Sequence, residues 1–543
     1  MCTIKETFSR LWLIFLIQYA NATRPHIVFI LADDLGWNDV SFHGSSQILT
    51  PNIDALAYSG LILNNYYVTP LCTPSRSALM TGKHPIHTGM QHRVLYGAEP
   101  RGLPLNETIL PQYLKELGYA THIVGKWHLG SYKMEYTPTF RGFDSHLGFW
   151  TGHHDYNDHT AMETGMWGLD MRRNTDVAWD LHGEYSTDIF SRESEKIIAN
   201  HNKSNPLFLY IAHAAVHSAN PYNPLPAPDD VVAKFQNISD YNRRRFAGIL
   251  TKLDESVGRV VQALQTNNMF KDSIIIFSTD NGGPASGFNL NAASNWPLRG
   301  VKNTLWEGGL RGAALLWSPL INAKKRVALQ RMHITDWLPT LYSAAGGDVK
   351  RLVNIDGYDL WTSLSNNEVS PRNEILHNID DNFGVSAITV GKWKLLNGST
   401  YSGAWDYWYG PSGRKGFYNI STVLTSPAGK ALSKIKVAAN ASMITNLRKS
   451  SEVDCASHHE LVPCRPLEAP CLFNIDTDPC ERTNVADEYP DTLSQLQKRL
   501  NEWKETEVPP SNLPIDPKGN PKYWEYTWNN FGDYTTYSVL NAR

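Results

Sequence analysis

Four apolar runs, each followed by polar residues, constrain the fold of this chain most strongly. The runs are His26–Leu31, Thr121–Val124, Pro206–Ala212 and Ser273–Ser278. Each is continuously apolar rather than alternating, which is typical of strands that are covered on both faces of a parallel sheet. We therefore expect these segments to form the centre of one buried sheet.

Helical patterns lie between the apolar runs. Apolar residues recur at helical spacing from Leu110 to Leu117, where Gly118 ends the pattern. They recur again from Tyr241 to Leu264 with a period of about 3.6 residues. This alternation of strands and helices favours an α/β sandwich with a large, mainly parallel sheet between helices.

The pattern changes near residue 375. The segment 386–396 is typical of a hairpin that turns at Gly391, and 471–475 is typical of a short strand. The segment 489–504 has the apolar face of an amphipathic helix. We therefore expect a smaller C-terminal α+β domain with an antiparallel sheet, followed by a tail that wraps the surface.

The N-terminus has its own composition. Lys5 and Arg10 precede the short apolar run Leu11–Ile17, and a small-x-small pattern follows at Ala20–Ala22. This combination is typical of a signal peptide, and the run is too short for a membrane anchor. The expected division of the chain is a signal peptide over residues 1–22, a catalytic domain over 23–375 and the C-terminal domain over 376–543.

Cysteine usage fits a secretory route. Cys455, Cys464, Cys471 and Cys480 cluster in the C-terminal part and allow three disulfide connectivities. Proximity alone favours Cys455–Cys464 and Cys471–Cys480, and it leaves Cys72 as a lone thiol far away in the sequence. Six sequons support the same route; they begin at Asn106, Asn202, Asn237, Asn397, Asn419 and Asn440.

Charge and hydropathy exclude two classes of protein. The formal net charge is -3 and the charges are well mixed, so no basic face or tail for nucleic acid is expected. After the N-terminal segment, no stretch approaches the roughly 18 apolar residues that a membrane span needs. We expect a mature protein that binds neither nucleic acid nor the membrane interior.

Polar residues follow each apolar run, where the carboxyl ends of parallel strands form ligand sites. They are Asp33 and Asp34, Lys126 and His128, His213 and His217, and Asp280 and Asn281. Turns and helix caps explain each pair alone, but four such endings on one sheet edge indicate a site. Carboxylate and amide oxygens suit Ca²⁺ or Mg²⁺, and the nearby histidines keep zinc open as an alternative.

The segment Leu71–Gly82 is typical of a short helix, with Pro74 in its first turn and Gly82 at its end. Cys72 then lies at the helix N-terminus, where partial positive charge stabilises a thiolate. A buried, unreactive thiol is the alternative, and these residues alone do not choose between the two.

Two motifs resemble the signatures of the sulfatase family. The first is Cys72-Thr-Pro-Ser-Arg76, which is followed by Leu79, Thr81 and Gly82, and the second is the segment 125–130, GKWHLG. The resemblance runs from about Arg24 to Tyr489. It is strongest to the arylsulfatase B branch, in the segments Leu35–Val40, Asn295–Gly300 and Leu376–Asp380.

The resemblance implies an alkaline-phosphatase-like sandwich and an unusual nucleophile. In this family the motif cysteine is oxidised to Cα-formylglycine, so Cys72 is expected to become an aldehyde whose hydrate, a gem-diol, attacks sulfur. The second hydroxyl of the diol then expels sulfate, which a serine could not do. The resemblance further implies one Ca²⁺ per chain, held by Asp33, Asp34, Asp280, Asn281 and the modified Cys72 itself.

The remaining roles are carried over in the same way. Arg76 would steady the diol and the metal ligands, and Lys126 and Lys302 would contact the sulfate. A surface position is the alternative for Lys302. His128 would accept the proton of the diol, and His217 would protonate the departing alcohol.

The resemblance leaves the substrate open. A sulfated sugar or aryl ester, as for arylsulfatase B, is the expected partner, and small esters such as glucosinolates are the alternative. The segments 153–158, 220–228 and 401–409 are expected to form the rim that decides this. A catalytically inactive binding protein is a further alternative. A formylglycine-generating enzyme is the expected maturation partner, and the expected location is the secretory pathway, with a lysosomal or extracellular destination.

Overall fold

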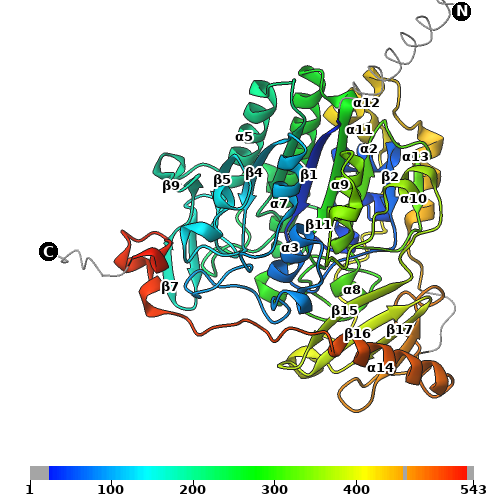
Figure 1. Cartoon of the computed structure of the whole chain (residues 1–543). Coiled ribbons are helices and arrows are strands. Elements are labelled where there is room, and N and C mark those ends of the chain that lie inside the picture. Colours follow the sequence, from blue (N-terminus) through cyan, green and yellow to red (C-terminus); the bar gives the residue numbers. More distant parts are fainter. Residues whose placement is uncertain (1–23, 456–460, 535–543) are drawn as a thin grey trace, which may run out of the picture.

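A ten-stranded sheet runs through the larger part of the molecule (Figure 1). The computed structural model describes residues 24–455 and 461–534, so the predicted signal peptide lies outside the described residues. The strand order is β13-β2-β12-β11-β1-β10-β4-β5-β8-β9. The central strands are β11 (Ser273–Thr279), β1 (His26–Ala32), β10 (Leu207–Ala212) and β4 (Ala120–Lys126). They are parallel neighbours, which confirms the prediction from the four apolar runs.

Shorter strands extend the sheet on both sides and make it mixed. β12 pairs antiparallel with β11 and with β2, whereas β13 and β2 are parallel. On the other side β5 is parallel to β4, and β8 and β9 follow in antiparallel pairs. These strands are β13 (Arg326–Ala328), β2 (Leu61–Leu63), β12 (Leu315–Trp317), β5 (Ser145–Phe149), β8 (Arg172–Arg173) and β9 (Asp176–Val177).

Helices cover both faces of the sheet because successive side chains of each strand point to opposite faces. Val28 and Ile30 of β1 pack in one apolar cluster with α2 (Pro51–Ser59), α5 (Ser186–Asn200) and α7 (Tyr241–Thr266). Ile27 and Phe29 pack on the other face with α3 (Cys72–Thr81), α4 (Leu110–Glu116) and α9 (Trp337–Ala344). The predicted α/β sandwich is therefore confirmed.

A second, antiparallel sheet lies at one end of the first (Figure 1). Its order is β15 (Glu374–Asp380), β16 (Val385–Val390), β17 (Trp393–Asn397) and β18 (Cys471–Asn474). The hairpin between β16 and β17 turns at Gly391, which has a left-handed φ of 54°. Helix α14 (Pro490–Lys504) buries Leu496 and Leu500 against this sheet. The predicted smaller antiparallel domain is confirmed.

The C-terminal half of the chain also contributes to the larger layer. Helices α11 (Ile420–Thr425), α12 (Pro427–Lys434) and α13 (Ala441–Ser451) contact α2 beside the first sheet. The last described segment runs back across the molecule to β7 (Met166–Leu169) and buries Trp528 there (Figure 1). The division of the chain at residue 375 stays a prediction.

The disulfide pairing differs from the one that proximity favoured. The bonds are Cys455–Cys480 and Cys464–Cys471, with Cα–Cα distances of 5.9 and 5.8 Å. The prediction was wrong because Cys471 opens β18, and an extended strand advances about 3.3 Å per residue. Cys480 is thereby carried away from Cys471 and packs with Cys455 near Trp37.

No helix in the described ranges is both long and apolar enough to cross a membrane.

Candidate active site

The carboxyl ends of the four central strands bring the predicted residues together. Asp33 and Asp34 follow β1, and Asp280 and Asn281 follow β11. Lys126 ends β4, and His217 lies on the segment after β10. Because these strands are adjacent and parallel, their carboxyl ends share one edge of the sheet. Asp34 N–H donates to Asp280 Oδ1 at 3.2 Å, which joins two of the strand ends directly.

Three buried cations pair with three buried carboxylates at this edge. Each carboxylate is completely enclosed, and a buried charge is stable only when it is paired or binds a metal. The pairs are Lys126 Nζ to Asp33 Oδ2 at 2.6 Å, Lys302 Nζ to Asp34 Oδ1 at 2.6 Å and Arg76 Nη2 to Asp280 Oδ2 at 2.8 Å. Lys302 is thus buried in the site, and the surface alternative for it is excluded.

Helix α3 positions Cys72 and Arg76. Cys72 is its first residue, and Arg76 follows one turn later on the same side, where it reaches Asp280. Gly82 ends the helix with a left-handed φ of 66°. Cys72 Sγ lies 3.6 Å from Asp33 Oδ1. Burial raises the pKa of the Cys72 thiol despite the nearby lysines, so the structure favours a buried, neutral thiol over a thiolate.

The oxygen atoms at this edge fit a hard cation. Ligand atoms of Asp33, Asp34, Cys72 and His217 lie within 4.8 Å of one another. Asp34 Oδ2 and Asn281 Oδ1 are buried acceptors without a hydrogen-bond partner among the described residues. Asn281 Nδ2 donates to Asp34 Oδ1 at 2.7 Å, which fixes the orientation of the amide. Such orphaned oxygens are satisfied by a bound ion, and oxygen donors suit Ca²⁺ better than zinc.

Two histidines each have one ring nitrogen fixed by a carbonyl. His128 Nε2 donates to Leu95 O at 2.9 Å, and its Nδ1 is buried without a partner among the described residues. His217 Nδ1 donates to Ser218 O at 2.6 Å, and its Nε2 lies 3.4 Å from Asp34 Oδ2. Burial lowers the pKa of His217 to about 3. Each ring therefore has one nitrogen left for proton exchange.

These residues open into a pocket of about 510 Å³, which we name the Cys72 pocket. Each of the three predicted rim segments reaches it, through His153, Pro221 and Tyr401. Sequence reasoning missed several other lining residues, among them Arg93, Tyr96, Glu163 and Phe383. They come from loops and from β6 (Thr160–Glu163), and no periodicity or motif marks them.

His153, from the first predicted rim segment, lies beside the predicted histidine His217. Its ring stacks on His217 with centroids 5.9 Å apart and an interplanar angle of 16°. Burial, together with the nearby His217 and Lys126, lowers the pKa of His153 to about 3. The neutral ring therefore packs beside His217. By contrast, His213, the other histidine after β10, is completely buried and bonds Ser256 Oγ of α7 at 3.0 Å, and it does not line the Cys72 pocket.

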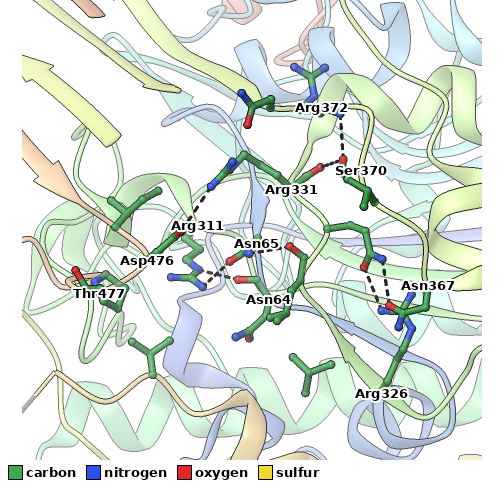
Figure 2. A pocket seen from close by; sticks show the side chains of 18 of the residues that line it. Asn64, Asn65, Arg311, Arg326, Arg331, Asn367, Ser370, Arg372, Asp476 and Thr477 are labelled. Carbon is green, nitrogen blue, oxygen red and sulfur yellow. Dashed lines mark hydrogen bonds and ion pairs between the residues drawn. The ribbon is translucent and has the colours of Figure 1, made fainter. Parts of the chain in front are cut away.

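A second hollow of about 1140 Å³ lies apart from these residues and shares no lining residue with the Cys72 pocket. Figure 2 shows it, and we name it the arginine cleft after Arg311, Arg326, Arg331 and Arg372. Each guanidinium already contacts other protein groups. Arg372, for example, donates to both oxygens of Asp336, and Arg331 lies 3.7 Å from Asp476.

Comparison with known proteins gives a consistent result. The family model described as Sulfatase matches residues 25–347. Mouse arylsulfatase J is 40% identical over 530 residues, which cover 94% of this chain and 80% of that protein. Human arylsulfatase A is 32% identical over 70% of this chain and 77% of its own length. Mouse N-acetylgalactosamine-6-sulfatase is 28% identical, over 89% and 87%.

Solved structures are similar along most of the chain. The structure of Ps i-CgsB in complex with k-i-k-neocarrahexaose is 26% identical, with a TM-score of 0.70, and the match covers 91% of this chain and 96% of that one. PsFucS1 sulfatase from Pseudoalteromonas sp. has a TM-score of 0.65 at 22% identity, over 92% and 94%, and shares the fold.

Proposed function

Because this chain belongs to the sulfatase family, whose members hydrolyse sulfate esters, we propose that it removes sulfate from a sulfated sugar at the Cys72 pocket. One observation carries the proposal: three buried cations, two orphaned buried oxygens and the motif cysteine converge on one point. Such a site holds an anion and a hard cation side by side. The net reaction is R–O–SO₃⁻ + H₂O → R–OH + HSO₄⁻.

The proposed nucleophile is the formylglycine form of residue 72, which a formylglycine-generating enzyme would produce during maturation. Its hydrate supplies an oxygen nucleophile that neither the buried thiol nor a serine can replace. The backbone of α3 holds residue 72 between Asp33 and the pocket. Nucleophilic catalysis of this kind divides one difficult step into two easier ones.

Asp33, Asp34, Asp280 and Asn281 would hold one Ca²⁺ beside residue 72. When bound, the ion would polarise a sulfate oxygen and favour ionisation of the diol. Arg76 binds the second carboxylate oxygen of Asp280 and so keeps that ligand in place. Lys126 and Lys302 lie at the same edge, where their ammonium groups would bind the sulfate oxygens.

The two histidines would move the protons. His217 Nε2 is the nitrogen left free by the Ser218 carbonyl; it would take up a proton from solvent water when the anionic sulfate ester binds and pass that proton to the oxygen of the departing alcohol. His128 Nδ1 is buried and unpartnered among the described residues, and it would accept the proton of the diol as the covalent ester breaks down. His153 would keep the His217 ring in place by stacking on it.

A sulfated carbohydrate is the proposed substrate, as for arylsulfatase B. Relatives named for sugar sulfates, such as N-acetylgalactosamine-6-sulfatase, and a relative solved with k-i-k-neocarrahexaose support a sugar. Two disulfides support passage through the secretory pathway to the lysosome or the cell exterior.

The test is turnover of purified protein from a eukaryotic secretory host. Chondroitin or dermatan oligosaccharides, a glucosinolate and an aryl sulfate are assayed side by side, with Cys72→Ala as the control. We expect the wild-type chain to release sulfate from the oligosaccharides and Cys72→Ala to release none. Release only from the small esters would contradict the sugar substrate, and no release from aldehyde-bearing protein would contradict the enzymatic function.

A further inference from the structure

Arg93 is an exposed cation on the rim of the Cys72 pocket. Its guanidinium makes no hydrogen bond or ion pair with any residue that the structure describes, and its contact is the ring of Phe383, 5.7 Å away. Apart from histidines, Lys302 and Glu163 are the other charged groups that line the pocket. Lys302 is paired with Asp34. Arg93 is therefore the lining cation without a carboxylate partner in the described part of the chain.

The segment that carries Arg93 is anchored directly to the catalytic residues. Leu95 N–H donates to Thr73 Oγ1 at 3.1 Å, and Leu95 O accepts the hydrogen bond of His128 at 2.9 Å. Two residues of chain span at most about 7 Å, so the backbone of Arg93 lies close to this anchor. A group on Arg93 is thus held at a fixed reach from the sulfate position.

A single carboxylate holds the other side of the segment. His92 Nδ1 lies 2.8 Å from Asp380 Oδ2, and Asp380 Oδ1 accepts the N–H of Phe383 at 3.2 Å. Arg93, next to His92, and Phe383 are therefore positioned by the same buried residue. The cation and its ring form one platform rather than two independent surface groups.

Glu163, the carboxylate that lines the pocket, is hydrogen-bonded to backbone groups and not to Arg93. Glu163 accepts the N–H groups of Gly97 and Gly152, at 2.6 and 3.0 Å. Burial raises the pKa of Glu163 to about 7, which weakens its negative charge near neutral pH. Glu163 therefore closes the pocket wall and does not serve as the partner of Arg93.

We propose that Arg93 binds a second anionic group of the substrate, a carboxylate or a second sulfate on the sugar next to the esterified one. The guanidinium offers planar, bidentate recognition of such a group. The rings of Phe383 and Tyr401 supply flat apolar surface for the sugar rings. The Tyr401 hydroxyl accepts a hydrogen bond from Asn303 Nδ2 at 2.7 Å, which fixes its ring. The substrate is then an acidic, multiply charged saccharide, and this inference rests on the proposed function.

The test compares Arg93→Ala and Arg93→Lys with the unmodified chain on three probes. The probes are an aryl sulfate, a monosulfated disaccharide that contains a uronate, and the methyl ester of that disaccharide. Arg192→Ala is the matched control, because Arg192 is an exposed arginine on α5 that pairs with Glu184 at 2.7 Å.

We expect Arg93→Ala to lower kcat/KM on the uronate disaccharide by about tenfold or more, since a hydrogen-bonded charge is lost. The kcat/KM of Arg93→Lys should lie between those of Arg93→Ala and the wild-type chain. Turnover of the aryl sulfate and of the methyl ester should change by less than about twofold, within the range of surface substitutions. Arg192→Ala should match the unmodified chain throughout.

A fourth probe, a disulfated disaccharide whose carboxyl group is esterified, separates the two anions. An Arg93 effect on this probe assigns the second sulfate, and an effect confined to the uronate assigns the carboxylate; both support the inference. Equal effects of Arg93→Ala on charged and uncharged probes, or no effect on any probe, would overturn it. Failure of the proposed function would give a different result from failure of the Arg93 inference, because the wild-type chain would then release sulfate from no probe.

Discussion

The Cys72 pocket and the arginine cleft differ in what their charges do. The arginine cleft is the larger, at about 1140 Å³ against about 510 Å³, and four arginines line it. Its arginines contact carboxylates, amides and carbonyls of the same chain, as Figure 2 shows for several of them. In the Cys72 pocket, paired charges surround acceptor oxygens that have no partner among the described residues.

Chemistry, and not volume, distinguishes the proposed active site from the arginine cleft. The arginine cleft also contains two buried atoms without a hydrogen-bond partner in the described part of the chain, Asn64 Oδ1 and Arg331 Nε. These atoms belong to groups that neither attack nor transfer protons at neutral pH. The Cys72 pocket, in contrast, combines the cysteine of the sulfatase motif, titratable imidazoles and the proposed cation site within a few ångströms.

The largest expected effect comes from removing the nucleophile. Cys72→Ala should lower kcat by at least about 10⁴-fold, as loss of a covalent nucleophile does in other hydrolases. Arg331→Ala in the arginine cleft should change kcat by less than about twofold. Steady-state sulfate release measures both variants. Comparable losses in the two variants would break the comparison between the two regions.

The proton donor should give the next largest effect. His217→Gln is expected to lower kcat by about 10²–10⁴-fold, because an alkoxide is a poor leaving group. The loss should shrink across a series of aryl sulfates as the leaving phenol becomes more acidic. His213→Gln is the control, since His213 is completely buried, bonds Ser256 and does not line the Cys72 pocket. A loss independent of the leaving group would contradict the assigned role.

Calcium removal should distinguish variants of the two regions by their Tm as well as by their activity. A ligand present at about 100 times its Kd stabilises the folded state by roughly 2.7 kcal/mol. Treatment with a chelator should therefore lower Tm and abolish sulfate release, and Ca²⁺ should restore both. Asp34→Asn should remove the Ca²⁺ response of Tm, whereas Asp476→Asn in the arginine cleft should keep it. A response retained by Asp34→Asn would count against the site.

The smallest effect concerns pH. Burial raises the pKa of Glu163 to about 7, above its ordinary value of 4.5. The protonated form is favoured by folding, so its contribution to stability is complete below pH 4.5 and is lost as the pH rises through about 7. Glu163→Gln cannot ionise, and it loses one hydrogen bond at every pH. The difference in Tm between the two proteins should therefore narrow by a few degrees from pH 5 to pH 8, and a constant difference would contradict the raised pKa.

The fold and the residues of the chemical centre could be predicted from the sequence because both depend on local patterns. Continuous apolar runs predicted β1, β10 and β11 almost to the residue, and the polar residues after them meet because parallel strands end at one edge. Hairpin and helix patterns likewise predicted β16, β17 and α14.

Part of the pocket rim and the disulfide pairing could not be predicted from such local patterns. Arg93 and Phe383 are separated by almost three hundred positions in the printed sequence, and only the fold brings the guanidinium over the ring, with His92 and Phe383 bonded to the same carboxylate of Asp380. The pairing of Cys455 with Cys480, 25 positions apart, depends likewise on the path of the chain through and after β18, which separation in sequence does not reveal.

The central claim is that residue 72 works as an aldehyde and not as a thiol. Its most direct test is the mass of the peptide that contains residue 72, from active protein made in a eukaryotic secretory host. The account predicts the formylglycine mass, with an aldehyde fraction that rises and falls with specific activity across preparations. Fully active protein in which every copy of that peptide carries unmodified cysteine would contradict it.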